Sequence, residues 1–103
     1  MKKDTYITEV IFRKWNRKEF KGDIIVLFPY FIETLGGSIM SYEHTGQHGS
    51  SDYNACIQMT VPAKEEDYKD LKEELEYIGY NLKVINKRNY KKYLVEYHKM
   101  KES

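Results

Sequence analysis

The apolar run Ile24–Phe28 (IIVLF) is the feature that most restricts how this chain can fold. It is the longest apolar run in the sequence, yet it is far shorter than the roughly 20 residues that a membrane-spanning helix needs. A short apolar run between polar segments is typical of a strand buried in the middle of a sheet. We therefore expect residues 23–29 to form a central strand that other elements cover.

The segments around this run predict a largely antiparallel sheet. Residues 6–15 alternate in polarity, contain β-branched and aromatic side chains, and precede a polar stretch, so we expect them to pair with the central strand as a hairpin. Two further segments after Gly36 and Gly37 have the alternation or composition of strands, and a shorter one lies near the C-terminus. The expected strands are residues 6–15, 23–29, 38–44, 54–61 and 81–85.

One segment, residues 64–78, has a clear helical pattern. Its apolar residues recur at spacings of three and four, which places them in one stripe along a helix. Acidic residues occupy the first turn, where the helix dipole favours negative charge, and Gly79 stands where a left-handed residue ends many helices. The stripe consists of Tyr68, Leu71, Leu75 and Ile78. We expect this acidic helix to cover one face of the sheet.

The tail over residues 89–101 fits two structures. Tyr90, Tyr93 and Tyr97 fit the stripe of a helix, whereas Tyr93, Val95 and Tyr97 fit the alternation of a strand. We favour the helix. The chain is then an α+β domain with a largely antiparallel sheet of about five strands, one amphipathic helix packed on it and a C-terminal helix.

The composition is that of a globular protein. Its amino acids are 41% hydrophobic and 32% charged, the net charge is +1, and residues 1–103 fit a single domain. Cys56 has no second cysteine with which to form an internal disulfide, and the sequence begins without the apolar core of a signal peptide. We therefore expect a cytoplasmic protein that contacts no membrane.

The uneven distribution of charge bears on nucleic-acid binding. The net charge is +4 over residues 1–22 and +5 over residues 81–103, but −4 over each of the stretches 23–62 and 63–80. The basic ends and the ten tyrosines fit a cationic groove that stacks single-stranded bases. The near-neutral total and the acidic helix argue against such a groove, so we do not expect nucleic acid as a partner.

The segment His44–Tyr53 (HTGQHGSSDY) is the main candidate for a binding site. It lies between two expected strands and holds more hydrogen-bonding groups than a hairpin turn requires. Its glycines and serine hydroxyls suit a loop whose backbone N–H groups turn inward around an anion. An arginine and a tyrosine on the expected strands, able to clamp a phosphate or stack on a base, complete the set. The candidate ligand-binding residues are Arg13, Tyr42, His44, Gln47, His48, Ser50, Ser51 and Asp52.

Other interpretations of this segment stay open. It is also compatible with a hydrogen-bonded structural turn. A metal site would need both imidazoles of its HxxxH spacing on one helix, which Gly46 and Gly49 disfavour, so we expect no metal and no cofactor. Ser50, Ser51 and Cys56 belong to no known nucleophile motif, which favours a binding protein over an enzyme.

Arg13 and Tyr42 each have a structural alternative as well. The stem of Arg13 can cover the edge of Trp15 on a solvent-facing surface. Tyr42 can serve as an ordinary core residue. The sequence leaves both alternatives open.

Several short motifs give the chain a resemblance to a known group of proteins. They are VIFR at Val10–Arg13, VLFP at Val26–Pro29, SYEHTGQHG at Ser41–Gly49, DY at Asp52–Tyr53 and IGYNLKV at Ile78–Val84. These motifs resemble an uncharacterised family of small proteins carried by bacterial phages, plasmids and conjugative elements, and the SYxHxGQHG segment is the most specific part. The resemblance covers residues 8–85 and leaves out the extension 87–103. It implies a mobile-element origin and a compact α+β fold, but no reaction and no catalytic residue.

Residue pattern and resemblance together support a binding function. Our first hypothesis is a small cytoplasmic, phage-type protein whose His/Gly/Ser loop captures an anionic ligand, such as a nucleotide or a nucleotide-derived signal, in a counter-defence role. The alternative is a protein–protein inhibitor that acts on a host or competing-element protein through the acidic helix at 64–78. Exposed tyrosine surface in so small a chain also leads us to expect a homodimer.

Overall fold

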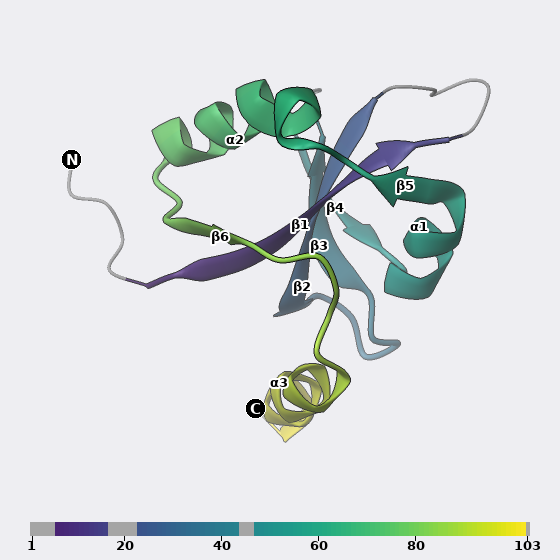
Figure 1. Cartoon of the computed structure of the whole chain (residues 1–103). Helices are drawn as coiled ribbons and strands as arrows, with labels where there is room; N and C mark the ends of the chain where they lie inside the picture. Colours follow the sequence, from purple (N-terminus) through teal and green to yellow (C-terminus); the bar gives the residue numbers. More distant parts are fainter. Residues whose placement is uncertain (1–5, 17–22, 44–46, 103) are drawn as a thin grey trace.

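Strand β2 (Ile24–Ile32) forms the middle of the sheet, as its apolar sequence predicts. The computed structural model describes residues 6–16, 23–43 and 47–102 (Figure 1). Consecutive side chains of a strand point to opposite sides of a sheet, so a buried run without alternation requires cover on both sides. Residues 24–28 are all buried, and helices lie on both faces of the sheet (Figure 1).

The other strands are β1 (Thr8–Trp15), β3 (Ile39–Glu43), β4 (Gln47–Ser51), β5 (Thr60–Pro62) and β6 (Leu82–Val84). The sheet is mostly antiparallel and has the order β4-β3-β2-β1-β5, with β6 parallel to the start of β1. The expected hairpin is the β1–β2 pair, in which Ile11 lies opposite Leu27 and Arg13 lies opposite Ile25. The antiparallel α+β class predicted from the sequence is therefore confirmed.

The helices of the described residues are α1 (Tyr53–Met59), α2 (Glu65–Ile78) and α3 (Tyr90–Glu102). The acidic helix α2 covers one face, where Leu71 and Leu75 pack with Val26 and Phe28. Gly79 follows it with φ of +128°, a backbone conformation that glycine adopts without strain. The expected helix and its packing on the sheet are both confirmed. None of the helices in these residues has the length and apolar character needed to cross a bilayer.

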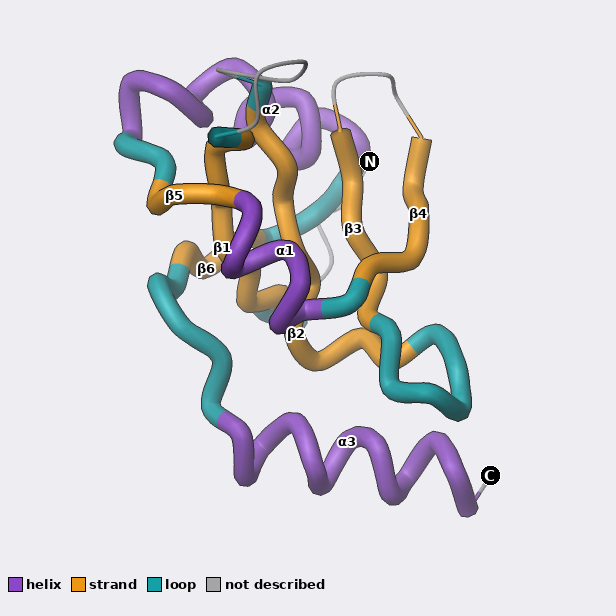
Figure 2. Tube along the Cα trace, turned by 90° about the vertical axis from the view of Figure 1, so that its right-hand side faces the viewer, coloured by secondary structure: helices purple, strands orange, loops and turns teal. Residues whose placement is uncertain are grey.

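The opposite face of the sheet is covered by α1 and α3. Cys56 from α1 and Tyr93 from α3 pack with Ile25 and Leu27 in a second core. Helix α3 lies below the end of β2 in both views (Figures 1 and 2), and the helical interpretation of the tail is confirmed. Both faces of the sheet are thus covered, whereas the sequence had led us to expect cover on one.

The predicted strand over residues 54–61 is wrong, because most of this segment folds as α1. Asp52 caps the helix, and its Oδ1 accepts a hydrogen bond from the backbone N–H of Asn54 at 3.1 Å. Apolar residues at a spacing of three and four then face the sheet, a helical stripe that the apparent alternation of the sequence concealed. That stripe consists of Tyr53, Cys56 and Ile57. Only residues 60–62 are extended, as β5.

The segment predicted as one loop contains the edge strand β4, which pairs along its length with β3. Strand β2 also continues past its predicted end. Its register against β3 shifts between Phe28 and Ile32, next to Pro29, which has no N–H to give to the ladder. The sheet therefore has an edge strand, β4, that was not predicted, and β2 is longer than predicted.

Leu75→Ala tests the core under α2. Leu75 is 0% exposed, and truncating a buried leucine leaves a cavity that costs about 2–5 kcal/mol of unfolding free energy. We expect a loss in this range in urea unfolding. Tyr77→Ala is the control on the same helix, because Tyr77 is 91% exposed and its loss should change stability little. Equal stability of the two variants would contradict the packing of α2.

Candidate functional site

The predicted site residues are divided between the two faces of the sheet. In the β3–β4 pair, Tyr42 lies opposite His48 and Ile39 lies opposite Ser51. Tyr42 belongs to the core under α2 and Ile39 to the core under α1 and α3, so alternate residues of β4 point to opposite sides. His48 and Ser50 therefore lie on the α2 side, whereas Ser51 lies on the α1 side.

On the α2 side, Tyr42 and His48 belong to an aromatic cluster. Their ring centroids are 4.8 Å apart in an edge-on arrangement, and His48 Nε2 lies 3.0 Å from Tyr80 Oη. Tyr42 is buried, and burial, followed by the negative charge of Glu74, raises the pKa of its phenol. These contacts give both residues a structural role, in line with the alternative that the sequence left open for Tyr42.

The two serines of the segment also have partners within the sheet. Ser50 Oγ donates to Glu33 Oε1 at 2.8 Å. On the other face, Ser51 Oγ lies 2.9 Å from Ser41 Oγ, and a hydrogen bond joins the two hydroxyls. Neither hydroxyl points into a shared anion site.

The other members of the predicted set on this segment are Gln47, Asp52 and His44. Gln47 begins β4, opposite Glu43. Asp52 caps α1 and also lines a polar cavity. His44 lies outside the described residues. Residues 47–51 form a ladder with β3 rather than the expected concave nest of N–H groups.

Arg13 caps the C-terminus of α1. Its Nε donates to Thr60 Oγ1 at 2.8 Å, and its Nη2 donates to the carbonyl oxygens of Thr60 at 2.8 Å and Ile57 at 3.1 Å. A cation at this end of a helix satisfies carbonyl groups that have no partner within the helix. The side chain is buried, and burial lowers the pKa of the guanidinium. Arg13 thus joins β1 to α1 and is turned away from solvent.

A polar cavity of about 300 Å³ lies where the β2–β3 turn, the start of α1 and the start of α3 meet. Its walls are residues 36–38, residues 52–54 and the side chains of Arg88, Tyr90 and Tyr93. We call this cavity the Arg88 pocket. It combines one cation, one carboxylate and several aromatic rings, and its size is at the lower end of the range for small-molecule sites.

Aromatic rings hold the guanidinium of Arg88. Its Cζ lies 4.1 Å from the centroid of the Tyr53 ring, 3.9 Å from that of Tyr93 and 5.7 Å from that of Tyr90. Within the described part of the chain, no oxygen accepts a hydrogen bond from the guanidinium N–H groups. A guanidinium that packs on ring faces keeps its donors along its edge. Arg88 is therefore held in place while its donors remain available.

Another wall of the pocket is formed by the turn between β2 and β3. Tyr93 Oη donates to the carbonyl oxygen of Gly37 at 2.8 Å. Gly37 has φ of +92°, and a Cβ on this residue would lie 2.5 Å from Tyr93 Oη. Glycine is therefore required here both for the backbone angle and for the close approach of the tyrosine. The contact ties the start of α3 to the turn.

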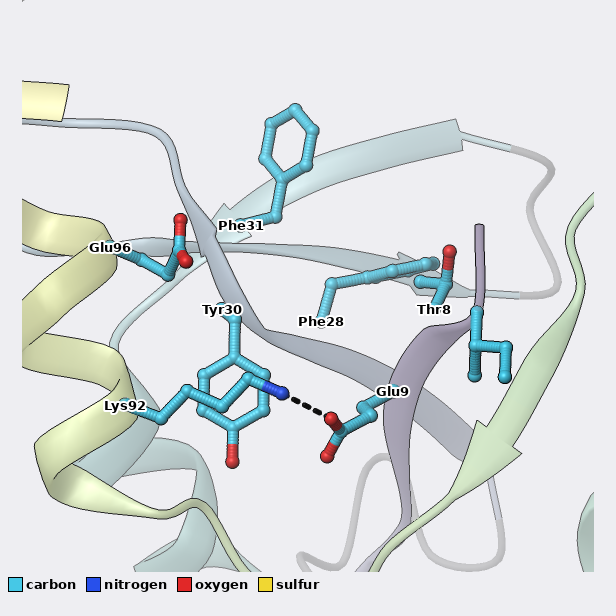
Figure 3. Close-up of a pocket in the computed structure, with 8 residues that line it drawn as sticks. Thr8, Glu9, Phe28, Tyr30, Phe31, Lys92 and Glu96 are labelled. Atoms are coloured by element: carbon cyan, nitrogen blue, oxygen red, sulfur yellow. Dashed lines mark hydrogen bonds and ion pairs between the residues drawn. The ribbon is translucent and has the colours of Figure 1, made fainter. Parts of the chain in front are cut away.

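A second cavity, of about 250 Å³, lies between the start of β1, the end of β2 and α3 (Figure 3). Lys92 reaches across it, forms an ion pair with Glu9 and lies 4.5 Å from the centroid of the Tyr30 ring. The hydrogen bond to Glu9 is the main cause of a raised pKa of Lys92. Because the protein's own cation occupies this cavity, we interpret it as a joint between α3 and the sheet.

Sequence reasoning missed Arg88. It follows Lys87 in the basic tail outside the resemblance, and its ring partner Tyr53 is 35 residues away in the chain. A partial signal was present, since a helix that begins just after Arg88 brings Tyr90 and Tyr93 close to it. Among the described residues, no three His, Cys, Asp or Glu side chains gather into a metal-binding group.

Replacing Arg13 with methionine tests its structural role. The change removes the Arg13 donor from the buried carbonyl oxygen of Thr60 and from the partly buried one of Ile57, and an unsatisfied buried group costs about 1–3 kcal/mol. We expect the unfolding free energy to fall by that order in urea titrations. Lys14→Met is the control, because Lys14 makes a partly exposed ion pair with Asp67 and should contribute less. Wild-type stability of the Arg13 variant would contradict the capping role.

Comparisons with known proteins add no relative to this description. No family model matches the chain, and no curated protein and no solved structure matches it either. The resemblance to small mobile-element proteins therefore stays a prediction, and the function has to be argued from the geometry of the site.

Proposed function

We propose that this chain is a binding protein that captures a small anionic ligand in the Arg88 pocket. The single observation that carries the proposal is the Arg88 guanidinium, which packs on the rings of Tyr53 and Tyr93 while its N–H donors have no acceptor among the described residues. The edge of an arginine matches the two oxygens of a carboxylate or a phosphate. Phosphate-bearing and carboxylate-bearing small molecules, nucleotides among them, are the ligand class that fits.

The rings also prepare the arginine for binding. A long side chain that is free in solvent loses rotamer freedom when a ligand immobilises it. Arg88 is restricted before any ligand arrives, because Tyr93 is bonded to Gly37 and the Tyr53 hydroxyl accepts the backbone N–H of Arg88 at 3.1 Å. Less conformational entropy is therefore lost on binding, which supports a binding role for the pocket.

The ligand class is the one expected from the sequence, but the site is different. The sequence placed the ligand at the His/Gly/Ser loop, whose His48, Ser50 and Ser51 have partners within the protein. Asp52 belongs to both sites, because it is part of the loop segment predicted from the sequence and also lines the Arg88 pocket. A host-derived nucleotide signal, captured in a counter-defence role, remains within this ligand class.

The burial and hydrogen bonds of the candidate nucleophiles favour a binding protein over an enzyme. Cys56 is buried, and burial raises the pKa of its thiol, which disfavours the reactive thiolate. Ser50 and Ser51 lie on opposite faces of the sheet and bond to other side chains. The Arg88 pocket contains the hydroxyl of Ser38 and the carboxylate of Asp52, but among the described residues no hydrogen bond joins that hydroxyl to a base.

Arg88→Gln tests the proposed site. Glutamine keeps part of the side-chain length but loses the charge and the two-pronged donor edge. AMP, GMP, CMP, UMP and ribose 5-phosphate serve as probes, and we expect at least one to raise the melting temperature of the wild-type protein. Isothermal titration of that probe should show an affinity lower by about 10- to 100-fold in the variant, the loss of a hydrogen-bonded charge.

Lys87→Gln is the matched control. It removes the same charge at the adjacent, exposed position, which does not line the pocket. The control should bind the probe like the wild-type protein. The proposal fails if none of the five probes raises the wild-type melting temperature, or if both variants lose affinity to the same extent.

A second candidate function is inhibition of a basic partner protein through the outer surface of α2. The observation in its favour is Tyr77, which is 91% exposed on a helix with seven acidic residues and two lysines. Exposed tyrosines are common centres of protein interfaces. The resemblance to mobile-element proteins makes a host or competing-element protein the natural partner.

Co-purification from a bacterial host distinguishes the two functions. An inhibitor acting through α2 should retain its partner in the Arg88→Gln variant and lose it in a Tyr77→Ala variant. Recovery of the same partner with Tyr77→Ala as with the wild-type protein would contradict an interface on α2.

A further inference from the structure

We infer that the ligand of the Arg88 pocket is a guanine mononucleotide, a step that rests on the proposed function. Arg88 accounts only for the anionic end of a ligand. Two other groups of the same pocket, the ring of Tyr90 and the carboxylate of Asp52, act on the rest of the molecule. Each of them restricts the ligand in a different way.

Tyr90 provides a surface for an aromatic group. Its side chain is 60% exposed, and its ring lies 6.0 Å from the Tyr93 ring with an angle of 24° between the two planes. The Cζ of Arg88 is 5.7 Å from its centroid, so the open ring and the anion-binding edge are neighbours. Proteins hold nucleobases by stacking them on exposed aromatic rings. A base on Tyr90 can therefore extend from a phosphate held at Arg88.

The carboxylate of Asp52 determines which base fits beside it. Its Oδ1 caps α1, while its Oδ2 accepts no hydrogen bond from the described residues. An ionised carboxylate is an acceptor only, and it repels a bare anion such as inorganic phosphate. A ligand that turns N–H donors toward Asp52 converts this repulsion into attraction. The pocket thus favours a molecule with an anionic end and a donor-rich end.

Guanine is the base with the matching edge. Its N1 and N2 groups place two N–H donors side by side, which suits a carboxylate whose Oδ2 is available and whose Oδ1 keeps a second lone pair beside its bond from Asn54. Adenine and cytosine carry a ring acceptor beside their amino group, and uracil carries a carbonyl on each side of its N–H. Those acceptors would face the negative charge of Asp52. Reading of this edge together with ring stacking is how proteins identify an extruded base.

The volume of the pocket agrees with this assignment. A cavity of about 300 Å³ exceeds the needs of a free phosphate ion and suits a small organic ligand. The turn at Gly37 forms one wall, and the bond from Tyr93 holds this turn in place. A mononucleotide can occupy the space between this turn, Arg88 and the Asp52 carboxylate.

The test is isothermal titration of GMP, AMP and ribose 5-phosphate into wild-type protein and an Asp52→Asn variant. Asparagine caps helices as well as aspartate does, so the variant keeps α1 while losing the charge. We expect the wild-type protein to bind GMP about tenfold or more tightly than AMP, the discrimination of one paired base edge. The variant should lose this preference, and its affinity for ribose 5-phosphate should stay the same or rise.

Asp70→Asn is the control, because it removes an exposed carboxylate of α2, away from the pocket, and should keep the preference for GMP. Equal wild-type affinities for GMP and AMP, or a preference that survives in Asp52→Asn, overturn the inference. If ligand binding still depends on Arg88 in that case, the proposed function stands. Failure of all three ligands to bind overturns the inference, and the proposed function falls with it only if CMP and UMP also leave the wild-type melting temperature unchanged.

Discussion

Strand β2 is buried on both faces, and this burial determines where the helices pack. Successive residues alternate between two cores, with Val26 under α2 and Leu27 under α1 and α3. Apolar surface on both sides of a strand has to be removed from water, so the chain must supply helices to each face (Figure 1). Because α1 and α3 share one face, Tyr53 and Arg88 come into contact although 35 residues separate them.

Two arginines on this face have opposite roles. Arg13 is buried, and its guanidinium donates to Thr60 and to the carbonyl oxygen of Ile57 at the C-terminal end of α1. Arg88 packs on Tyr53 and Tyr93 through its faces, and its donors find no acceptor in the described part of the chain. A buried arginine with satisfied donors stabilises a fold, whereas a stacked arginine with available donors is suited to an anion.

The sequence predicted the parts of the fold that depend on long, regular patterns. The apolar run at 24–28 and the stripe containing Leu71 and Leu75 correctly gave the central strand and α2. It failed at 54–61, where a helix of seven residues is too short for its stripe to differ from alternation, and the cap from Asp52 decides the structure. The Arg88 pocket could not be predicted from the sequence, because three distant segments form it and only tertiary packing brings them together.

If an anion binds at the edge of Arg88, side-chain NMR of arginine-labelled protein will detect it. The chain has three arginines, so their Nε–Hε signals can be assigned by substitution. On titration with nucleoside monophosphates, we expect a saturable shift of the Arg88 signal and an unchanged Arg13 signal, because Arg13 is already bonded within the protein. An Arg88 signal that stays in place with every nucleotide would show that no nucleotide binds at this arginine.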